Sequence, residues 1–249
     1  MVAARPLGRG HLNQDENMKK IFLTALFLNV FAFFVACTTD ADEEVDTFDA
    51  SVVCPADGLN KYGMPNRGTF IDERDGQEYK YTTIGDQVWM AENLNYAAER
   101  SVCQGKDPAK CDLYGRFYYT YIDNSLGFSG TVDWDMIDSV CPKGWHAPTL
   151  VEWKTLISSV NSSDSSITAA RLKSVDGWEN SNWGGGTDDC GFRSLPSGEY
   201  SYKSENEGDR ALFLTSTAKH ADLLYYIFVS GMVGDSFTSN RLVIRCLKD

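Results

Sequence analysis

CPKGWHAPT, at residues 141–149, and the LVEW that follows it are the stretch from which the fold of this chain is predicted. A cysteine and a Pro-x-Gly turn lead to Trp145, and a Pro-Thr pair then starts a helix. Thr149 is a natural N-cap, and Glu152 three residues later completes a capping box. Apolar residues continue at helical spacing, so the predicted helix buries one stripe. The stripe consists of Leu150, Trp153, Leu156, Ile157 and Val160.

Length and charge limit the classes of protein to which the chain can belong. Its 249 residues suit one large domain, or one domain with appendages. Acidic residues number 35 and basic residues 23, for a formal net charge of -12. Binding to nucleic acid requires a basic stripe that neutralises phosphates, so no nucleic-acid partner is expected.

The first 36 residues are interpreted as a signal peptide. Residues 18–20 (MKK) are a short basic start, and the apolar run at 21–36 is too short for a transmembrane helix. Met18 is the alternative translation start, because nothing before it fits this pattern. The run ends in Phe-Val-Ala before Cys37, which resembles a bacterial lipobox, although Phe34 stands where leucine is usual. We expect Cys37 to be lipidated; the alternative is ordinary signal cleavage nearby, which leaves Cys37 as a free thiol.

Lipidation would place the protein in the bacterial cell envelope, with the membrane as a partner through the N-terminal lipid. Thr38 rather than an aspartate follows the cysteine, which favours outer-membrane anchoring, with surface exposure as a further expectation. Residues 37–67 are expected to form an acidic disordered tether and a loop, since 38–49 hold six acids and hardly an apolar residue. The folded domain is predicted to span 68–249.

Turn dipeptides between β-forming residues predict an antiparallel meander at the start of the domain, with strands at 69–72, 78–84 and 87–90. Residues 114–121 are aromatic enough for a core strand with one solvated face. A short helix at 166–174 and an irregular long loop at 179–190 are predicted next. Further antiparallel strands are predicted at 192–202, 211–217, 223–229 and 242–246.

Six cysteines follow Cys37, an even set that suits disulfides in an exported protein. They are Cys54, Cys103, Cys111, Cys141, Cys190 and Cys246. Cys103 and Cys111 flank a short polar loop, so we expect them to pair. Zinc ligation by these two is the alternative, but no second pair matches it.

Eight motifs occur in order over residues 69–249. They are FID at 70–72, RDGQ at 74–77, IGDQVWMAENLN at 84–95, YGRFY at 114–118, CPKGWH at 141–146, GF at 191–192, LPSG at 195–198 and RCLKD at 245–249. With these motifs the chain resembles the Fibrobacter succinogenes major paralogous domain family. The resemblance implies an exported bacterial protein, often a lipoprotein, and it implies no particular activity, since the family has no settled one.

The Cys-Pro-x-Gly-Trp motif before an amphipathic helix, with a last cysteine near the C-terminus, is also distantly similar to the C-type lectin-like fold. GWHAPT with Glu152 and Trp153 is similar to the lectin-like domain of formylglycine-generating sulfatase-modifying enzymes. The similarity implies an α+β fold with small twisted antiparallel sheets, two helices and a long-loop region. The chain ends of that fold lie side by side, which implies a disulfide between Cys141 and Cys246. Cys54 and Cys190 then pair by elimination.

Residues suited to catalysis are scarce in this sequence. After the signal peptide the histidines are His146 and His220, and no H-E-x-x-H, G-x-S-x-G or phosphate-loop motif occurs. His146, beside Trp145, is interpreted as structural rather than as a ligand. Sulfatase-modifying enzymes need reactive cysteines, and Cys190 and Cys246 cannot be matched to them. No catalytic residue is therefore predicted.

The long loop and its surroundings supply the residues predicted to bind a ligand. They are Trp178, Trp183, Asn182, Asp188, Asp189, Tyr200 and Tyr202. Exposed aromatic rings stack on sugars, and core packing is the alternative for either tryptophan. Asn180, Asn182 and the two aspartates offer oxygen ligands for calcium, with a polar loop as the alternative. No metal or other cofactor is predicted.

Two hypotheses for the function follow. The first is a noncatalytic envelope module that binds cell-wall polysaccharide or an envelope protein through the long-loop face. The second is an enzyme of the sulfatase-modifying type, which would need a free, reactive thiol in a cleft.

Overall fold

The structure, a computed structural model, describes residues 46–122, 131–178, 184–200, 207–220, 223–230, 232–238 and 241–249. The predicted signal peptide, Cys37 and the first part of the acidic tether lie outside these residues. The same is true of four residues predicted to bind a ligand or calcium, namely Asn180, Asn182, Trp183 and Tyr202.

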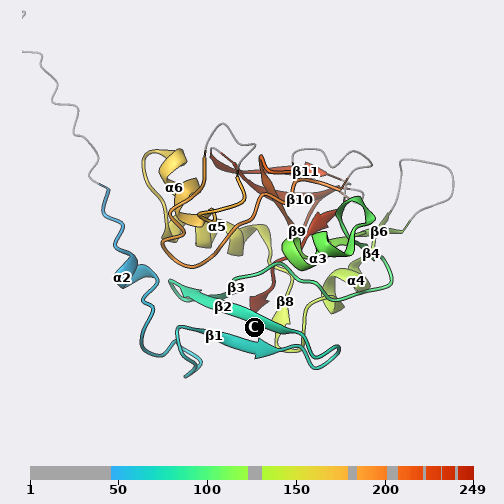
Figure 1. The fold of residues 1–249 in the computed structure, drawn as a ribbon, viewed down its shortest axis with the longest axis horizontal. Helices are drawn as coiled ribbons and strands as arrows, with labels where there is room; N and C mark the ends of the chain where they lie inside the picture. The colour runs from blue at the N-terminus through green and yellow to red at the C-terminus, as the bar shows by residue number, and fades with distance from the viewer. Residues whose placement is uncertain are drawn as a thin grey trace, which may run out of the picture. The chain divides into compact units, whose positions relative to one another are not determined.

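A five-stranded antiparallel sheet contains the predicted meander (Figure 1). Its order is β1-β2-β3-β13-β8. The turn between β1 and β2 contains Gly76 at φ 76°, a left-handed conformation that glycine adopts without strain. The strands are β1 (Arg67–Ile71), β2 (Glu78–Ile84), β3 (Gln87–Met90), β8 (Trp145–His146) and β13 (Leu247–Lys248).

A second, six-stranded sheet has the order β11-β10-β9-β12-β5-β4. The β12–β9 pairing is parallel, and the other pairings within this sheet are antiparallel. A small hairpin of β6 (Tyr121–Ile122) and β7 (Thr131–Val132) stands apart from both sheets. The six strands are β4 (Ser101–Val102), β5 (Phe117–Tyr118), β9 (Ala211–His220), β10 (Leu223–Val229), β11 (Val233–Thr238) and β12 (Leu242–Val243).

The last eight residues join the two sheets, because β12 belongs to one sheet and β13 to the other. Between these strands Ile244, Arg245 and Cys246 are completely buried. The carbonyls of Ile244 and Cys246 accept hydrogen bonds from the backbone N–H groups of Leu94 (2.8 Å) and Met90 (3.0 Å). The end of the chain is therefore part of the core, which is divided between two apolar clusters.

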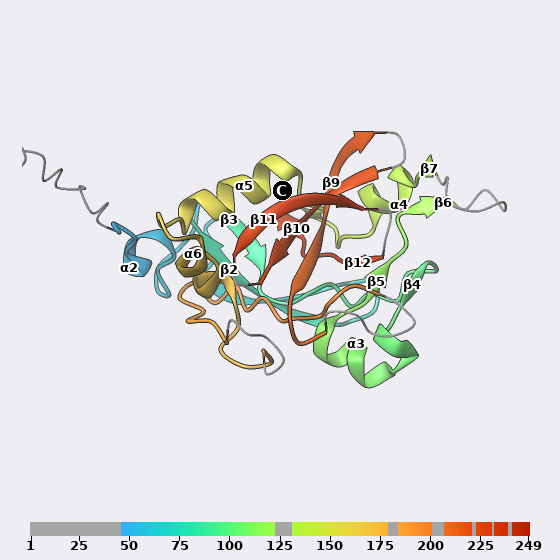
Figure 2. The ribbon, with the colours of Figure 1, turned by 90° about the horizontal axis from the view of Figure 1, so that it is seen from above.

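Helix α5 (Leu150–Ser159) begins at the predicted cap, and both reciprocal bonds of the Thr149–Glu152 capping box are present. Its Trp153 is fully buried, 4.6 Å from the ring of Trp89. The helix packs on β9 and β10 (Figure 2). The other helical segments are α2 (Ala50–Val53), the 3-10 turn η1 (Gln104–Lys106), α3 (Pro108–Tyr114), α4 (Trp134–Ser139) and α6 (Ser165–Leu172). Within the described residues, no helix has the length and apolarity needed to cross a membrane. The architecture is α+β, as predicted.

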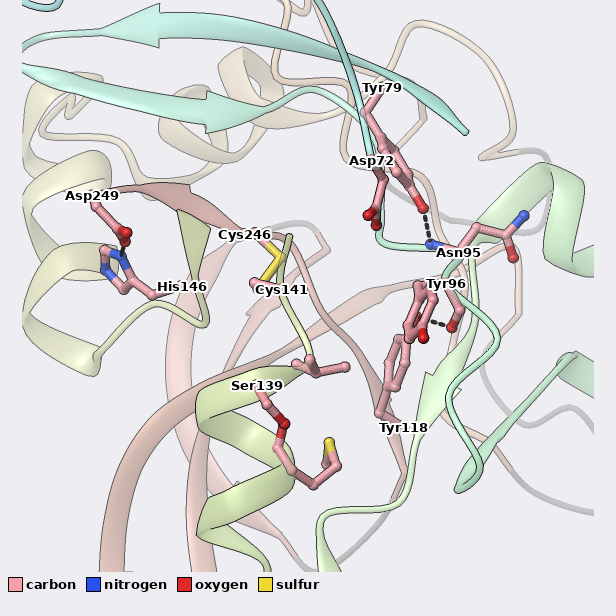
Figure 3. The surroundings of a disulfide bond; sticks show 12 residues. Asp72, Tyr79, Asn95, Tyr96, Tyr118, Ser139, Cys141, His146, Cys246 and Asp249 are labelled. Atoms are coloured by element: carbon pink, nitrogen blue, oxygen red, sulfur yellow. Dashed lines mark hydrogen bonds and ion pairs between the residues drawn. A yellow bond between two sulfur atoms is a disulfide. The ribbon is translucent and has the colours of Figure 1, made fainter. Parts of the chain in front are cut away.

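Three disulfides link the described cysteines in the pairs that the sequence analysis proposes. Cys103–Cys111 closes a short loop, and Cys54–Cys190 and Cys141–Cys246 join segments 136 and 105 residues apart. Figure 3 shows that Cys141–Cys246 connects the chain just after α4 to the buried C-terminal segment.

The domain starts earlier than the expected boundary near Gly68, because the compact unit begins at Asp46. Asp46 forms an ion pair with Arg171, and the ring of Phe48 lies 4.0 Å from the same guanidinium. Cys54 is buried and bonded to Cys190. Composition alone indicates a tether here, but contacts that include one disulfide and one arginine hold the segment that starts at Asp46 on the domain.

Two predicted strands need correction. The aromatic run at 114–121 is interrupted, since Tyr114 ends α3 and Gly115, at φ 74°, caps it, so only β5 and the start of β6 remain. Residues 192–200 contain isolated bridges at Ser194 and Gly198 instead of a continuous strand. Pro196 between them lacks the N–H that a ladder requires.

Candidate functional site

Three neighbouring strands end together at one edge of the six-stranded sheet. Ser101 of β4 and Leu242 of β12 both stand opposite Tyr118 of β5. One position beyond these pairs, Arg100, Tyr119 and Arg241 come side by side, and the Tyr119 N–H donates to the Arg100 carbonyl at 2.9 Å. Side chains alternate along a strand, so the buried Tyr118 and the half-buried Tyr119 face opposite sides. Figure 2 shows β4, β5 and β12 next to one another.

Tyr200 extends this arrangement, because its N–H donates to the Arg241 carbonyl at 3.4 Å. The guanidinium of Arg241 lies 4.2 Å from the ring centroid of Tyr119 and 4.7 Å from that of Tyr200. The guanidinium of Arg100 lies 5.1 Å from the Tyr119 ring. Cations and rings thus alternate through four residues, and each such contact contributes about 0.5–2 kcal/mol. We call Arg100, Tyr119, Arg241 and Tyr200 the tyrosine–arginine row.

The row lines an open groove with a volume of about 450 Å³. That volume lies within the range of small-ligand sites, roughly 300–1,000 Å³. Three of the charged lining residues are cations and one is an anion, although the whole chain has a net charge of -12. We call this the tyrosine–arginine groove; its lining consists of Glu99, Arg100, Ser101, Val102, Lys106, Tyr119, Tyr200 and Arg241.

The two arginines of the groove have different partners. Arg100 forms an ion pair with Asp133, with Nη1 and Oδ2 3.1 Å apart. In the part of the chain that the structure describes, Arg241 contacts two rings and forms no ion pair. A guanidinium has five N–H donors in its plane, and ring contacts on its faces leave that edge available. Arg241 is therefore the arginine of the row whose charge is open to a ligand.

The disulfide loop forms one wall of the groove and carries Lys106. Gln104, which is fully buried, donates through Nε2 to the carbonyls of Ser197 (3.4 Å) and Glu199 (3.0 Å). These bonds hold the loop against the segment that leads to Tyr200. Lys106 is exposed and has φ 60°, a left-handed conformation that is uncommon for a residue with a side chain.

Arg116 holds this wall on the sheet. Its Nη1 lies 3.5 Å from Cys111 Sγ and 3.8 Å from Cys103 Sγ, and its Nε donates to Ser101 Oγ at 2.9 Å. The Arg116 side chain therefore joins the disulfide to β4, whose Ser101 and Val102 line the groove.

Of the residues predicted from sequence to bind a ligand, Tyr200 lines the groove, whereas Trp178 requires correction. Trp178 is only 3 % exposed, its Nε1 donates to Ser174 Oγ at 3.0 Å, and Lys173 Nζ lies 4.2 Å from its ring. The ring belongs to the core and cannot stack on a sugar.

Asp188 and Asp189 support the backbone next to Cys190 instead of meeting Tyr200 in the groove. Asp188 Oδ1 accepts a hydrogen bond from the Arg193 N–H at 2.7 Å, and burial raises the pKa of Asp188. Asp189 Oδ2 lies 3.9 Å from Arg171 Nε. Within the described residues, no three histidine, cysteine, aspartate or glutamate side chains group as metal ligands would.

The glycine triplet at 184–186 also has a structural role. A Cβ atom on Gly186 would come within 2.2 Å of the Lys173 carbonyl oxygen, so the loop backbone passes too close to α6 for any side chain. The triplet lies within the loop predicted at 179–190.

His146 contacts two carboxylates of the protein itself. Its Nδ1 lies 2.8 Å from Asp249 Oδ1 and its Nε2 lies 3.0 Å from Glu152 Oε1 (Figure 3 shows the first contact). The histidine therefore ties the chain end to the first turn of α5.

A second cavity, of about 260 Å³, lies beside Arg245. Arg245 is fully buried, and Asn93 Oδ1 accepts from its Nε (3.0 Å) and Nη2 (2.7 Å). Loss of hydration lowers the pKa of Arg245 to about 9. Since its donors are directed at the protein's own acceptors, we interpret this arginine as structural.

Three residues of the groove, Arg100, Tyr119 and Arg241, are not predicted as site residues from the sequence. Tyr119 lies in a run predicted to have one solvated face, which is a partial signal. The two arginines have no local pattern that distinguishes them, because only the strand register brings them to Tyr119.

Comparison with known proteins identifies the family to which the chain is similar. Residues 82–248 match the family model described as the Fibrobacter succinogenes major domain. No curated protein and no solved structure matches the chain.

Proposed function

The chain belongs to the Fibrobacter succinogenes major domain family, and on that premise we propose that it is a noncatalytic lipoprotein of the bacterial cell envelope whose domain binds a saccharide through the tyrosine–arginine groove. The observation that carries the proposal is the row in which Arg241 lies between Tyr119 and Tyr200 at the groove wall. Tyrosine and arginine, together with tryptophan, are enriched among the residues that contribute most of the binding energy at protein interfaces.

The location in the envelope is supported by chain features. A signal-peptide pattern ends in a lipobox-like sequence at Cys37, and three disulfides suit an oxidising compartment. Cys37 precedes Asp46, where the compact unit begins, by nine positions (46 minus 37). Such a connection spans roughly 30 Å at most when fully extended. We propose outer-membrane anchoring through this connection.

A lectin-like topology is part of the same proposal. The N-terminal meander and the final strand β13 share one sheet, and Cys141 before β8 is bonded to Cys246 near the chain end. Both features are expected of that fold. The alternative of a sulfatase-modifying enzyme needs a reactive thiol, and the six described cysteines are all paired in disulfides.

Binding of the purified lipoprotein in detergent to immobilised envelope polysaccharides tests this function. We expect at least one polysaccharide to be retained, and Tyr119→Ala/Tyr200→Ala to lose it. Tyr62→Ala is the matched control, because Tyr62 is exposed and does not line the groove. Retention by the double variant, or capture of an envelope protein in place of any saccharide, would contradict the proposal.

Anchoring is tested separately with Cys37→Ser in the full chain. Its processing should change and it should partition into the aqueous phase of a detergent extraction, while the parent enters the detergent phase. An unchanged distribution would remove the lipid anchor from the proposal.

A further inference from the structure

We infer that the saccharide bound by the tyrosine–arginine groove is an acidic one, with uronic-acid carboxylates, and that Arg241 is the residue that selects the carboxylate. This inference rests on the proposed saccharide-binding function and names the ligand class of the same groove.

The orientation of Arg241 is the first argument. Tyr119 and Tyr200 contact its guanidinium at 4.2 and 4.7 Å, and the backbone on both sides is held by hydrogen bonds of the sheet edge. A guanidinium between rings is preorganised, so little side-chain freedom is lost when a ligand binds. Its donors lie in the plane, where a planar carboxylate can accept two parallel hydrogen bonds.

The second argument is that the row already uses ring surface that a neutral sugar would need. Tyr119 is contacted by Arg100 and Arg241, and Tyr200 is contacted by Arg241 and lies 6.1 Å from Phe117. Guanidinium groups therefore compete with a sugar for these rings. The groove offers charged N–H donors instead, which favours an anionic ligand.

The third argument is the local excess of positive charge. Arg100, Lys106 and Arg241 face one carboxylate, Glu99, and part of the Arg100 charge is matched by Asp133. Lys106 is exposed and, among the described residues, forms no ion pair. Two cations, Lys106 and Arg241, thus remain on one groove, which suits a polymer that repeats its carboxylates. The otherwise acidic chain would repel such a polymer elsewhere.

Calorimetric titration of the lipoprotein in detergent with tri(galacturonic acid), its methyl ester and a neutral trisaccharide tests the inference. We expect the acid to bind at least about tenfold more tightly than the ester or the neutral sugar. Arg241→Gln should weaken binding of the acid about 10- to 100-fold, and Arg241→Lys should weaken it less, because lysine keeps the charge without the planar fork. Affinity should also fall as salt is raised.

Lys154→Gln is the control, since it removes one positive charge from α5, where no groove residue lies, and it should leave binding unchanged. Inorganic phosphate, added as a competitor, tests whether the groove binds phosphate instead of a carboxylate. If phosphate displaces tri(galacturonic acid) at equal concentration, the carboxylate assignment is wrong. Equal affinity for acid and ester, or an unchanged Arg241→Gln variant, would also overturn it. If the neutral sugar still binds and Tyr119→Ala/Tyr200→Ala abolishes that binding, the proposed function survives this failure. If no saccharide binds, both the proposed function and the assignment of an acidic ligand are wrong.

Discussion

Arg241 and Arg245 lie four residues apart on the C-terminal segment and have opposite surroundings. Arg245 is fully buried, and its donors reach Asn93 Oδ1 and the carbonyls of Phe192 and Arg193. Arg241 is half-buried between two tyrosines at a groove. The same residue type therefore stabilises the core at one position and faces a ligand site at the other.

The difference lies in what the neighbouring elements supply. The buried end meets segments rich in acceptors, so a cation without hydration is held by uncharged oxygens and by rings. At the groove end two rings contact Arg241, and among the described residues no carboxylate forms an ion pair with it, so its charge keeps an open edge. We expect changes at the buried end to affect stability and changes at the groove end to affect binding.

The largest effect on stability should come from removing a disulfide. Cys141–Cys246 lies at the buried end, and Cys103–Cys111 lies in the wall of the groove. Replacing Cys141 and Cys246 together by serine removes a link across 105 residues, for which chain-entropy estimates give about 4.7 kcal/mol as an upper figure. The same replacement at Cys103 and Cys111, which are 8 residues apart, should cost at most about 2.5 kcal/mol. Urea unfolding of both variants measures the difference. A smaller loss for the Cys141/Cys246 pair would contradict the central position assigned to the C-terminal segment.

Substitution of the two arginines should have the next largest effect on the free energy of unfolding. Arg245→Gln leaves buried acceptors without donors, so the free energy of unfolding should fall by about 3 kcal/mol. Arg241→Gln, the same substitution four residues earlier, loses only half-exposed ring contacts and should cost about 1 kcal/mol or less. Chemical denaturation at neutral pH compares them. Equal losses would place Arg241 in the core and weaken its assignment to the groove.

A smaller effect than that of Arg245→Gln concerns acid and the ion pair that supports the buried end. Asp72 accepts three hydrogen bonds from the Arg74 side chain, and Arg74 Nη1 donates to the Val140 carbonyl, next to Cys141. Burial alone raises the pKa of Asp72, but the hydrogen bonds and charge of Arg74 leave it below the ordinary 3.8. The same balance holds for Glu152. Burial raises its pKa, but hydrogen bonds from Thr149 and His146 outweigh this effect, so the pKa of Glu152 lies below its ordinary value.

For a carboxyl with a depressed pKa in the folded state, the stabilisation is present above the unfolded pKa and is lost as pH falls through the folded one. The parent should therefore be more stable than Asp72→Asn by about 2 kcal/mol at pH 7. This difference should begin to shrink only below about pH 4, as the pH falls through the lowered pKa of Asp72. Thermal unfolding between pH 7 and 3 checks this. Asp138→Asn, on the exposed side of α4, controls for net charge. A difference that stays constant with pH would show that the ion pair contributes nothing.

The sequence by itself determined the features that depend on neighbouring residues. The capping box of Thr149 and Glu152, the hairpins around Gly76 and Gly85, and the Cys103–Cys111 bridge all formed as predicted. Each depends on groups a few residues apart, so backbone geometry is sufficient. The resemblance to a lectin-like fold further indicated the Cys141–Cys246 pair.

Tertiary structure decided the rest. Tertiary contacts order the segment at 46–67. Asp46 pairs with Arg171 and Cys54 is bonded to Cys190, and both partners are more than a hundred positions away. The groove depends still more on distant parts, because Arg100, Tyr119, Tyr200 and Arg241 come from four segments of the chain. Strand pairing brings them together, and a shift of one residue in register would turn every side chain to the other face of the sheet. Local sequence contains no record of that pairing, so the site could be found only in the folded molecule.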